Sequence, residues 1–183
     1  MKKYELLVDD TITFFGVQLF RIKALISFSG IEKGEVGGYI ASEKNLSQSG
    51  DAWVSGDARV SGDAEVSGDA MVYGNAEVSG DARVYGNARV SGDARVSGNA
   101  RVSGDARVSG DADYIVFKNT WSSGRYFTYT KSNKKWRVGC FYGYGYELIE
   151  KAYKDSQKSG DYYKAYVEFV EKLEEIEKIH KEK

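Results

Sequence analysis

Histidine and cysteine, the side chains that most often serve as a general base, a nucleophile or a zinc ligand, are scarce in this chain of 183 residues. There is one histidine, His180, and one cysteine, Cys140, so a Cys–His nucleophile would require these two to meet. His180 lies in a charged tail beside Lys178 and Lys181, where a positioned general base is not expected. Cys140 ends a strand-like pattern just before Phe141, which favours a buried structural thiol. Zinc sites need several Cys or His ligands, so the sequence predicts no catalytic residue, no metal and no cofactor.

Aromatic and arginine side chains remain as candidates for recognition, and they gather between residues 121 and 146. Trp, Tyr and Arg are the residue types enriched at interface hot spots. The alternative is cross-strand packing within a small sheet. The tyrosines between glycines, Tyr142, Tyr144 and Tyr146, are expected to be the most exposed. The predicted partner-binding residues of this segment are Trp121, Arg125, Trp136, Tyr142 and Tyr144.

The segment that carries these side chains follows a repeat of six residues, which starts at Ser49 and must support it. It reads SGDAWV, SGDARV, SGDAEV and so on without insertion, until an eleventh unit, SGDADY, degrades. Ala and Val of each unit share one face of a short strand, because side chains alternate with a period of two. The residue between them points outward. Gly followed by Asp or Asn then turns the chain, so each unit is a strand and a corner.

This pattern resembles the hexapeptide repeat of left-handed parallel β-helices, with Val as the aliphatic residue and Ala as the small one. The resemblance implies three hexapeptides per triangular coil, and therefore about four coils. The same step continues upstream, so the first coil is expected to begin near Val36. A right-handed β-helix like that of bactofilins is the alternative. We expect a mainly β protein.

Stacking with a period of eighteen residues predicts columns of outward-facing side chains. The columns are Trp53, Met71, Arg89 and Arg107; Arg59, Glu77, Arg95 and Asp113; and Glu65, Arg83 and Arg101. Arginine therefore occupies every face near the C-terminal end, and Arg89, Arg95, Arg101 and Arg107 are candidates to bind an acidic partner. The alternative is a solvated surface on which arginines pair with corner Asp residues. The corner Asp and Asn residues also stack, and a cation between stacked Asp side chains is a further alternative.

The segments on either side, 1–35 and 113–183, are expected to cap the exposed edges of the 36–112 β-helix. An N-terminal hairpin is predicted from residues 3–8 and 18–25, with Thr11 to Phe15 as its extension. The C-terminal cap is predicted to be α+β. Its expected strands are 114–118, 125–130 and 135–141, the last two joined by a turn at Ser132 and Asn133.

Two helices are predicted to follow, a short one at 147–156 and a longer one with Asp161 as its N-cap. The longer helix carries a heptad seam that could pack on the hairpin or on a second subunit, giving a dimer or trimer. The seam residues are Tyr162, Tyr166, Phe169, Leu173 and Ile176.

Composition narrows the classes of partner. The net charge is −1, and no segment is basic enough to indicate nucleic-acid binding. No apolar run approaches the ~20 residues of a membrane span, and no apolar stretch follows the two N-terminal lysines as in a secretory signal. With a single cysteine, these features favour the cytoplasm.

The whole pattern resembles a family of phage and prophage proteins of unassigned function. The resemblance is carried by KYEL, RIKAL, VGGYI, NLSQSGDAWV and a later GCFYG before a helix. It implies a small protein of a bacterial host's cytoplasm without established enzyme activity. Because such phage proteins often inhibit host defence, anti-CRISPR proteins among them, we expect a non-enzymatic protein that docks on a host protein.

Two alternatives remain. One is a structural homo-oligomer that serves as an assembly scaffold. The other is an acyltransferase, the best-known activity of hexapeptide-repeat proteins, which uses a histidine in the groove between the subunits of a trimer. His180 is poorly placed for that role, and the coils lack the looped insertions that shape acceptor sites.

Overall fold

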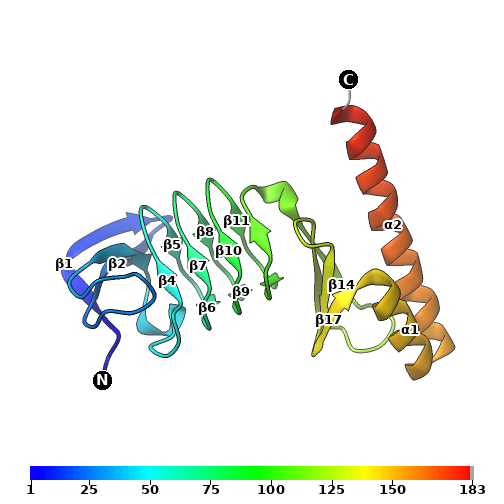
Figure 1. The fold of residues 1–183 in the computed structure, drawn as a ribbon, viewed down its shortest axis with the longest axis horizontal. Coiled ribbons are helices and arrows are strands. Elements are labelled where there is room, and N and C mark those ends of the chain that lie inside the picture. Colours follow the sequence, from blue (N-terminus) through cyan, green and yellow to red (C-terminus); the bar gives the residue numbers. More distant parts are fainter. Residues whose placement is uncertain (182–183) are drawn as a thin grey trace.

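A computed structural model describes residues 1–181. Three parts follow one another along the long axis, as Figure 1 shows: an N-terminal hairpin, a parallel β-solenoid of about four turns, and a four-stranded sheet covered by two helices. None of the helices in residues 1–181 combines the length and apolar character that a membrane crossing requires. The left-handed winding stays a prediction from the hexapeptide pattern.

The solenoid is built from two-residue strands that each end at the valine of a hexapeptide. They are β4 (Trp53–Val54), β5 (Arg59–Val60), β6 (Glu65–Val66), β7 (Met71–Val72), β8 (Glu77–Val78), β9 (Arg83–Val84), β10 (Arg89–Val90), β11 (Arg95–Val96), β12 (Arg101–Val102) and β13 (Arg107–Val108). Each strand from β4 to β10 pairs in parallel with the third strand after it, which confirms the predicted period of eighteen residues. The predicted column that ends in Asp113 is shorter than expected. Asp113 lies in a 3₁₀ turn (Asp111–Asp113), so this column ends at Arg95.

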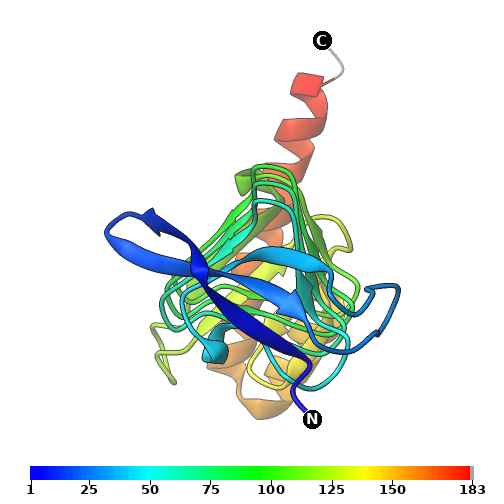
Figure 2. The same ribbon diagram turned by 90° about the vertical axis from the view of Figure 1, so that its left-hand side faces the viewer.

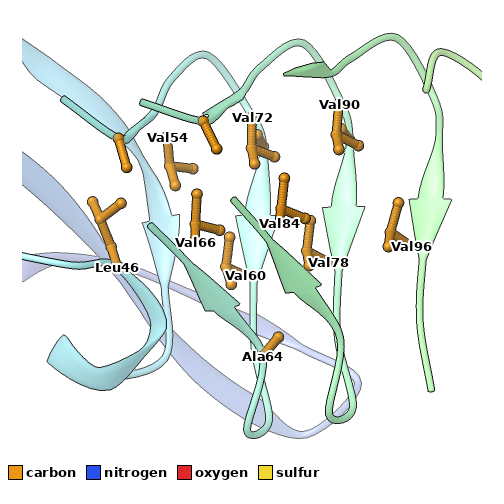
Figure 3. Close-up of a cluster of buried hydrophobic side chains, with 14 of the residues drawn as sticks. Leu46, Val54, Val60, Ala64, Val66, Val72, Val78, Val84, Val90 and Val96 are labelled. Carbon is orange, nitrogen blue, oxygen red and sulfur yellow. The ribbon is translucent and has the colours of Figure 1, made fainter. Parts of the chain in front are cut away.

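The core of the solenoid is a slim stack of the repeat's alanines from Ala52 to Ala106 and valines from Val54 to Val108, all of which are fully or almost fully buried. Figure 3 shows the valines from successive turns pointing into the same interior, with Leu46 at the N-terminal end. The corners are equally tight. Gly62 has φ of +66°, and a Cβ there would lie 3.1 Å from the backbone nitrogen of Gly80. Glycine is therefore required at this corner by both the backbone conformation and the close approach of the next turn.

The N-terminal cap continues one sheet of the solenoid. β1 (Tyr4–Phe14) pairs with β2 (Val17–Ala24), which pairs antiparallel with β3 (Val36–Ile40), and β3 pairs in parallel with β5. The predicted hairpin and its extension are thus confirmed. Figure 2, which looks onto this end, shows the hairpin crossing the coils. Trp53 was expected to face solvent, but it is fully buried edge-on against Phe28, with ring centroids 5.5 Å apart.

Side-chain donors cover the carbonyls that face the N-terminal end of the solenoid. Within the stack, Arg59 donates its N–H to the carbonyl of Ala76 in the next turn, so the alanine carbonyls point toward the N-terminus. At the end itself, the Lys3 ammonium donates to the carbonyls of Gly50 (3.1 Å) and Ala52 (2.8 Å). A 3₁₀ turn (Glu43–Asn45) carries a second donor, because the Asn45 amide donates to Gly62 and Ala64.

Side-chain acceptors complete the opposite end, where backbone N–H groups of the last turn have no further turn to bond. Arg95 donates its N–H to the Asp111 carboxylate (2.7 Å), Arg101 to the Thr128 hydroxyl (3.0 Å), and Arg107 to the Ser132 hydroxyl (2.8 Å). Buried backbone donors without partners would cost free energy. The C-terminal sheet is therefore attached to the solenoid by side-chain hydrogen bonds rather than by a continued β-ladder.

The C-terminal sheet consists of β14 (Tyr114–Lys118), β15 (Tyr126–Thr130), β16 (Lys135–Val138) and β17 (Phe141–Tyr144), antiparallel and in chain order. The strand predicted at 135–141 is divided, because Gly139 and Cys140 form a turn in which Gly139 has φ of +56°. Cys140 is consequently exposed, so the expectation of a buried thiol was wrong.

Two helices cover one face of this sheet. α1 (Gly145–Asp155) and α2 (Gln157–Lys181) meet at Ser156, whose hydroxyl accepts the N–H of Ser159. Ser156 is therefore the N-cap of α2, and Asp161, the predicted cap, lies inside the helix. The buried face of α2 is formed by Tyr163, Val167 and Val170.

Candidate functional site

The four solenoid arginines predicted to bind an acidic partner lie on different faces of the solenoid. Arg89 and Arg107 belong to the β4–β7–β10–β13 sheet, Arg95 to the sheet that contains β5, β8 and β11, and Arg101 to the β6–β9–β12 sheet. A triangular rod turns these faces away from one another, so a single compact partner surface cannot contact all four. Arg95 pairs with Glu77 in its own column (3.7 Å), as the alternating charges of that column predict.

Arginines do converge beside the β6–β9–β12 face, where the C-terminal sheet meets the solenoid. Arg83 on β9 and Arg101 on β12 come from the solenoid, whereas Arg125 precedes β15 and Arg137 lies on β16. All four line one cleft of about 510 Å³, and three of them also line an adjoining cleft of about 380 Å³. We call these joined clefts, defined by Arg83, Arg101, Arg125 and Arg137, the arginine groove.

The charges in the arginine groove are incompletely balanced. Two carboxylates lie on its walls, Glu65 and Asp81, and Glu65 is 3.7 Å from Arg83. Within residues 1–181, no carboxylate lies within 4.0 Å of the guanidinium groups of Arg101, Arg125 or Arg137. Like charges held around a concave surface produce a focused positive potential. The groove therefore favours a ligand that brings negative charge.

Packing fixes the orientation of Arg137. Its guanidinium lies 5.1 Å from the centroid of the Tyr85 ring and 5.8 Å from that of Tyr142, and its Nε is buried without a hydrogen-bond partner in the described chain. An arginine held by aromatic rings keeps its planar fork in place and loses less entropy when it binds a carboxylate. Arg137 thus supplies a preorganised donor at the wall of the groove.

The two tryptophan candidates pack inside the C-terminal part. Trp136 is 2% exposed, and the Trp121 ring stacks on Tyr162 with centroids 4.6 Å apart. Cross-strand and helix packing, the alternative expected from the sequence, accounts for both tryptophans. Their burial against α2 leaves the arginines as the more accessible part of the predicted surface.

Tyr142 attaches the sheet to the solenoid. Its hydroxyl lies 2.9 Å from the Asp105 carboxylate and 3.2 Å from the Ser103 carbonyl, and it accepts a hydrogen bond from Asn133. Burial raises the pKa of Tyr142 to about 12, and the hydrogen bond to Asp105 acts in the same direction. The same hydrogen bond lowers the pKa of Asp105.

Tyr144 and Tyr146 are exposed, as predicted, and their rings stack with centroids 5.9 Å apart. They border a second cleft of about 380 Å³ that reaches α2. Tyr142 was expected to be equally exposed, but it is only half-exposed, because its hydroxyl bonds the solenoid. Tyr142 and Tyr144 belong to β17 and Tyr146 to α1.

The predicted heptad seam is divided by the fold. Tyr162 and Tyr166 contact Trp121, and Leu173 is half-buried, whereas Phe169 and Ile176 are exposed. The intrachain face of α2 is rotated by one position from the predicted seam. The prediction that the seam joins two subunits stays a prediction.

His180 and Cys140 are not brought together: His180 is exposed in the last turn of α2, whereas Cys140 lies in the wall of the arginine groove. No group of three or more His, Cys, Asp or Glu side chains in residues 1–181 has an arrangement that could hold a metal ion. Two groove residues, Arg83 and Arg137, were not among the predicted site residues. The sequence could have identified Arg83 as a site residue, because it stands in the same column as Arg101. Nothing in the sequence places Arg137 near either of them.

A comparison with family models finds the YdcK beta-solenoid repeat at residues 76–92, 82–98, 88–103 and 94–110. The repeat is similar to that of the YdcK solenoid. Successive matches begin six residues apart and each spans nearly one turn of eighteen residues, in agreement with the strand register. The matches cover part of the solenoid and neither cap. No curated protein matches the chain.

Proposed function

We propose that this protein is a non-enzymatic binding protein that holds an acidic segment of a host protein in the arginine groove. The observation that carries the proposal is the convergence of Arg83, Arg101, Arg125 and Arg137 on one cleft with carboxylates too few to balance them. Arginine is suited to this role because its guanidinium group can bind a carboxylate through two hydrogen bonds.

A protein partner is favoured over a nucleic acid. Glu65 and Asp81 stand on the walls of the groove, where they would repel a continuous phosphate backbone. A protein surface can place its own positive groups opposite these two carboxylates and its acidic groups opposite the arginines. The resemblance to phage and prophage proteins extends the proposal to the bacterial cytoplasm, where a host defence complex such as a CRISPR nuclease is the proposed class of target.

Calorimetric titration of the protein with a Glu-rich octapeptide and with an octathymidylate tests the proposed ligand chemistry. We expect the peptide to bind and the oligonucleotide to bind at least ~10-fold more weakly. Arg101→Glu with Arg125→Glu should reduce peptide affinity by about 100-fold, because two charge pairs become repulsive. Arg89→Glu with Arg107→Glu makes the same change of net charge on another face and should leave the affinity within about 3-fold of the wild type.

Equal loss in both double variants would mean that the peptide responds to net charge and would contradict the proposal. Absence of peptide binding, or tighter binding of the oligonucleotide, would also contradict it. Each variant should keep the far-ultraviolet circular dichroism spectrum of the wild type, since the arginine side chains of both pairs project from the surface.

A further inference from the structure

Helix α2 leaves an apolar stripe exposed along most of its length. Tyr162 is 42% exposed, Phe169 51%, Ile176 43% and Ile179 55%. Ala165 and Lys172, also exposed, fill the gaps. The six residues are spaced 3, 4, 3, 4 and 3 apart, which places them along one side of an α-helix. We call this set the α2 stripe.

The α2 stripe lies outside the face of the helix that packs on the sheet, although Tyr162 and Phe169, at its near edge, also contact Trp121 and Phe117 of the same chain. Tyr163, Val167 and Val170 form the buried face, and Glu174 and Glu177 continue it by bonding Tyr129 of β15 and Lys131 of the turn that follows. At about 100° per residue, the middle of the stripe is separated from either edge of the buried face by more than about 45° around the helix axis. In Figure 1 the C-terminal half of α2 extends beyond the sheet, which leaves its outer side uncovered.

We infer that the α2 stripe joins two copies of this chain in an antiparallel helix pair. The stripe matches itself when reversed: Tyr162 of one copy meets Ile179 of the other, and Ala165 meets Ile176. Interfaces related by a two-fold axis require such a self-complementary pattern.

The single charge within the stripe also finds a suitable position in this register. Phe169 of one copy lies opposite Lys172 of the other, so the ammonium group can lie on the aromatic face in a cation–π contact. A parallel pair would instead bring Lys172 against Lys172, with two like charges at the centre of an apolar seam. The antiparallel pair therefore satisfies all six positions, and the parallel pair does not.

The pairing is independent of the arginine groove. The stripe lies on α2, and none of its residues lines the groove. A dimer would carry two copies of the groove and increase the apparent affinity for a partner with repeated acidic segments. Failure of peptide binding and failure of dimerisation can therefore be told apart.

Sedimentation equilibrium of the full chain measures the association. We expect the wild type to have twice the monomer mass at about 100 μM. Phe169→Glu with Ile176→Glu should give the monomer mass, and Val8→Glu, at an exposed apolar residue of the hairpin, should remain dimeric. A monomeric wild type, or a double variant that still dimerises, would overturn the inference.

Disulfide trapping tests the orientation of the two helices with small substitutions in the stripe. In a Cys140→Ser background, Ala165→Cys and Ile176→Cys are made as separate chains, mixed and oxidised. The antiparallel pair predicts a disulfide between the two different chains, because residues 165 and 176 face each other. Efficient disulfides between two copies of the same variant would indicate a parallel pair and overturn the proposed register.

Discussion

At the scale of single residues, Lys3 shows how a charged side chain can close the end of a solenoid. Its side chain is buried, donates to two backbone carbonyls and lies 5.1 Å from the centroid of the Phe28 ring. Burial lowers its pKa from 10.5 to about 8. The ammonium is retained near neutral pH at the expense of its own hydration, because a carbonyl without a donor would also cost free energy.

Replacement of Lys3 by Met should lower the free energy of unfolding by about 1–3 kcal/mol at neutral pH, because two carbonyls lose their donor. Chemical denaturation measures this value. Lys2→Met is the matched control, since Lys2 is exposed and pairs with Glu43 at the surface. A similar loss in both variants would contradict the role of Lys3 as a cap.

The stability of the wild type should also depend on pH through Lys3. Between about pH 8 and 10.5 the unfolded chain holds the Lys3 proton more tightly than the folded chain, so the free energy of unfolding rises with pH. Denaturation at about pH 7.5 and 9, where tyrosines with a pKa near 10 are still about nine-tenths protonated, should show a larger increase in the free energy of unfolding in the wild type than in Lys3→Met. Equal rises would exclude Lys3 as the source.

At the scale of elements, the hydroxyl of Thr128 connects β15 to the last solenoid turn. It accepts the N–H of Arg101, and Thr128 is almost fully buried. Thr128→Val keeps the shape but removes the acceptor, so we expect a loss of about 1–2 kcal/mol and faster hydrogen exchange of the Arg101 amide. Thr13→Val on the exposed side of the hairpin should change neither quantity. Unchanged exchange at Arg101 would contradict the assigned contact.

At the scale of the whole molecule, each cap bonds the end turn beside it, so the number of turns between the caps can change without loss of a cap contact. Deletion of residues 67–84 removes one full turn of eighteen residues and keeps each cap above the same face. Deletion of residues 67–72 removes one face and rotates the C-terminal cap by about a third of a turn.

The two deletions should differ in the size of their effect. Because repeat proteins gain stability roughly per repeat, the eighteen-residue deletion should fold with a lower melting temperature. The six-residue deletion should also fold, with a smaller decrease in melting temperature, since Thr128 and Ser132 still face the amides of the last turn. Calorimetry compares them, and a six-residue deletion that does not fold would contradict the independence of the two caps.

The sequence by itself determined the solenoid, its period, the cap hairpin and most strand bounds. The reason is that Ala-x-Val and Gly-Asp repeat a local strand and corner, and stacking then forces residues eighteen apart into register. It also placed Arg101 and Arg125 among the candidates. Only the tertiary structure decided that these two meet Arg83 and Arg137, because the angle at which the sheet docks on the last turn depends on side-chain caps far apart in sequence. The packing of α1 and α2 on the sheet buried Trp136 and rotated the apolar seam of α2, since a helix face is assigned by what packs against it as well as by its spacing.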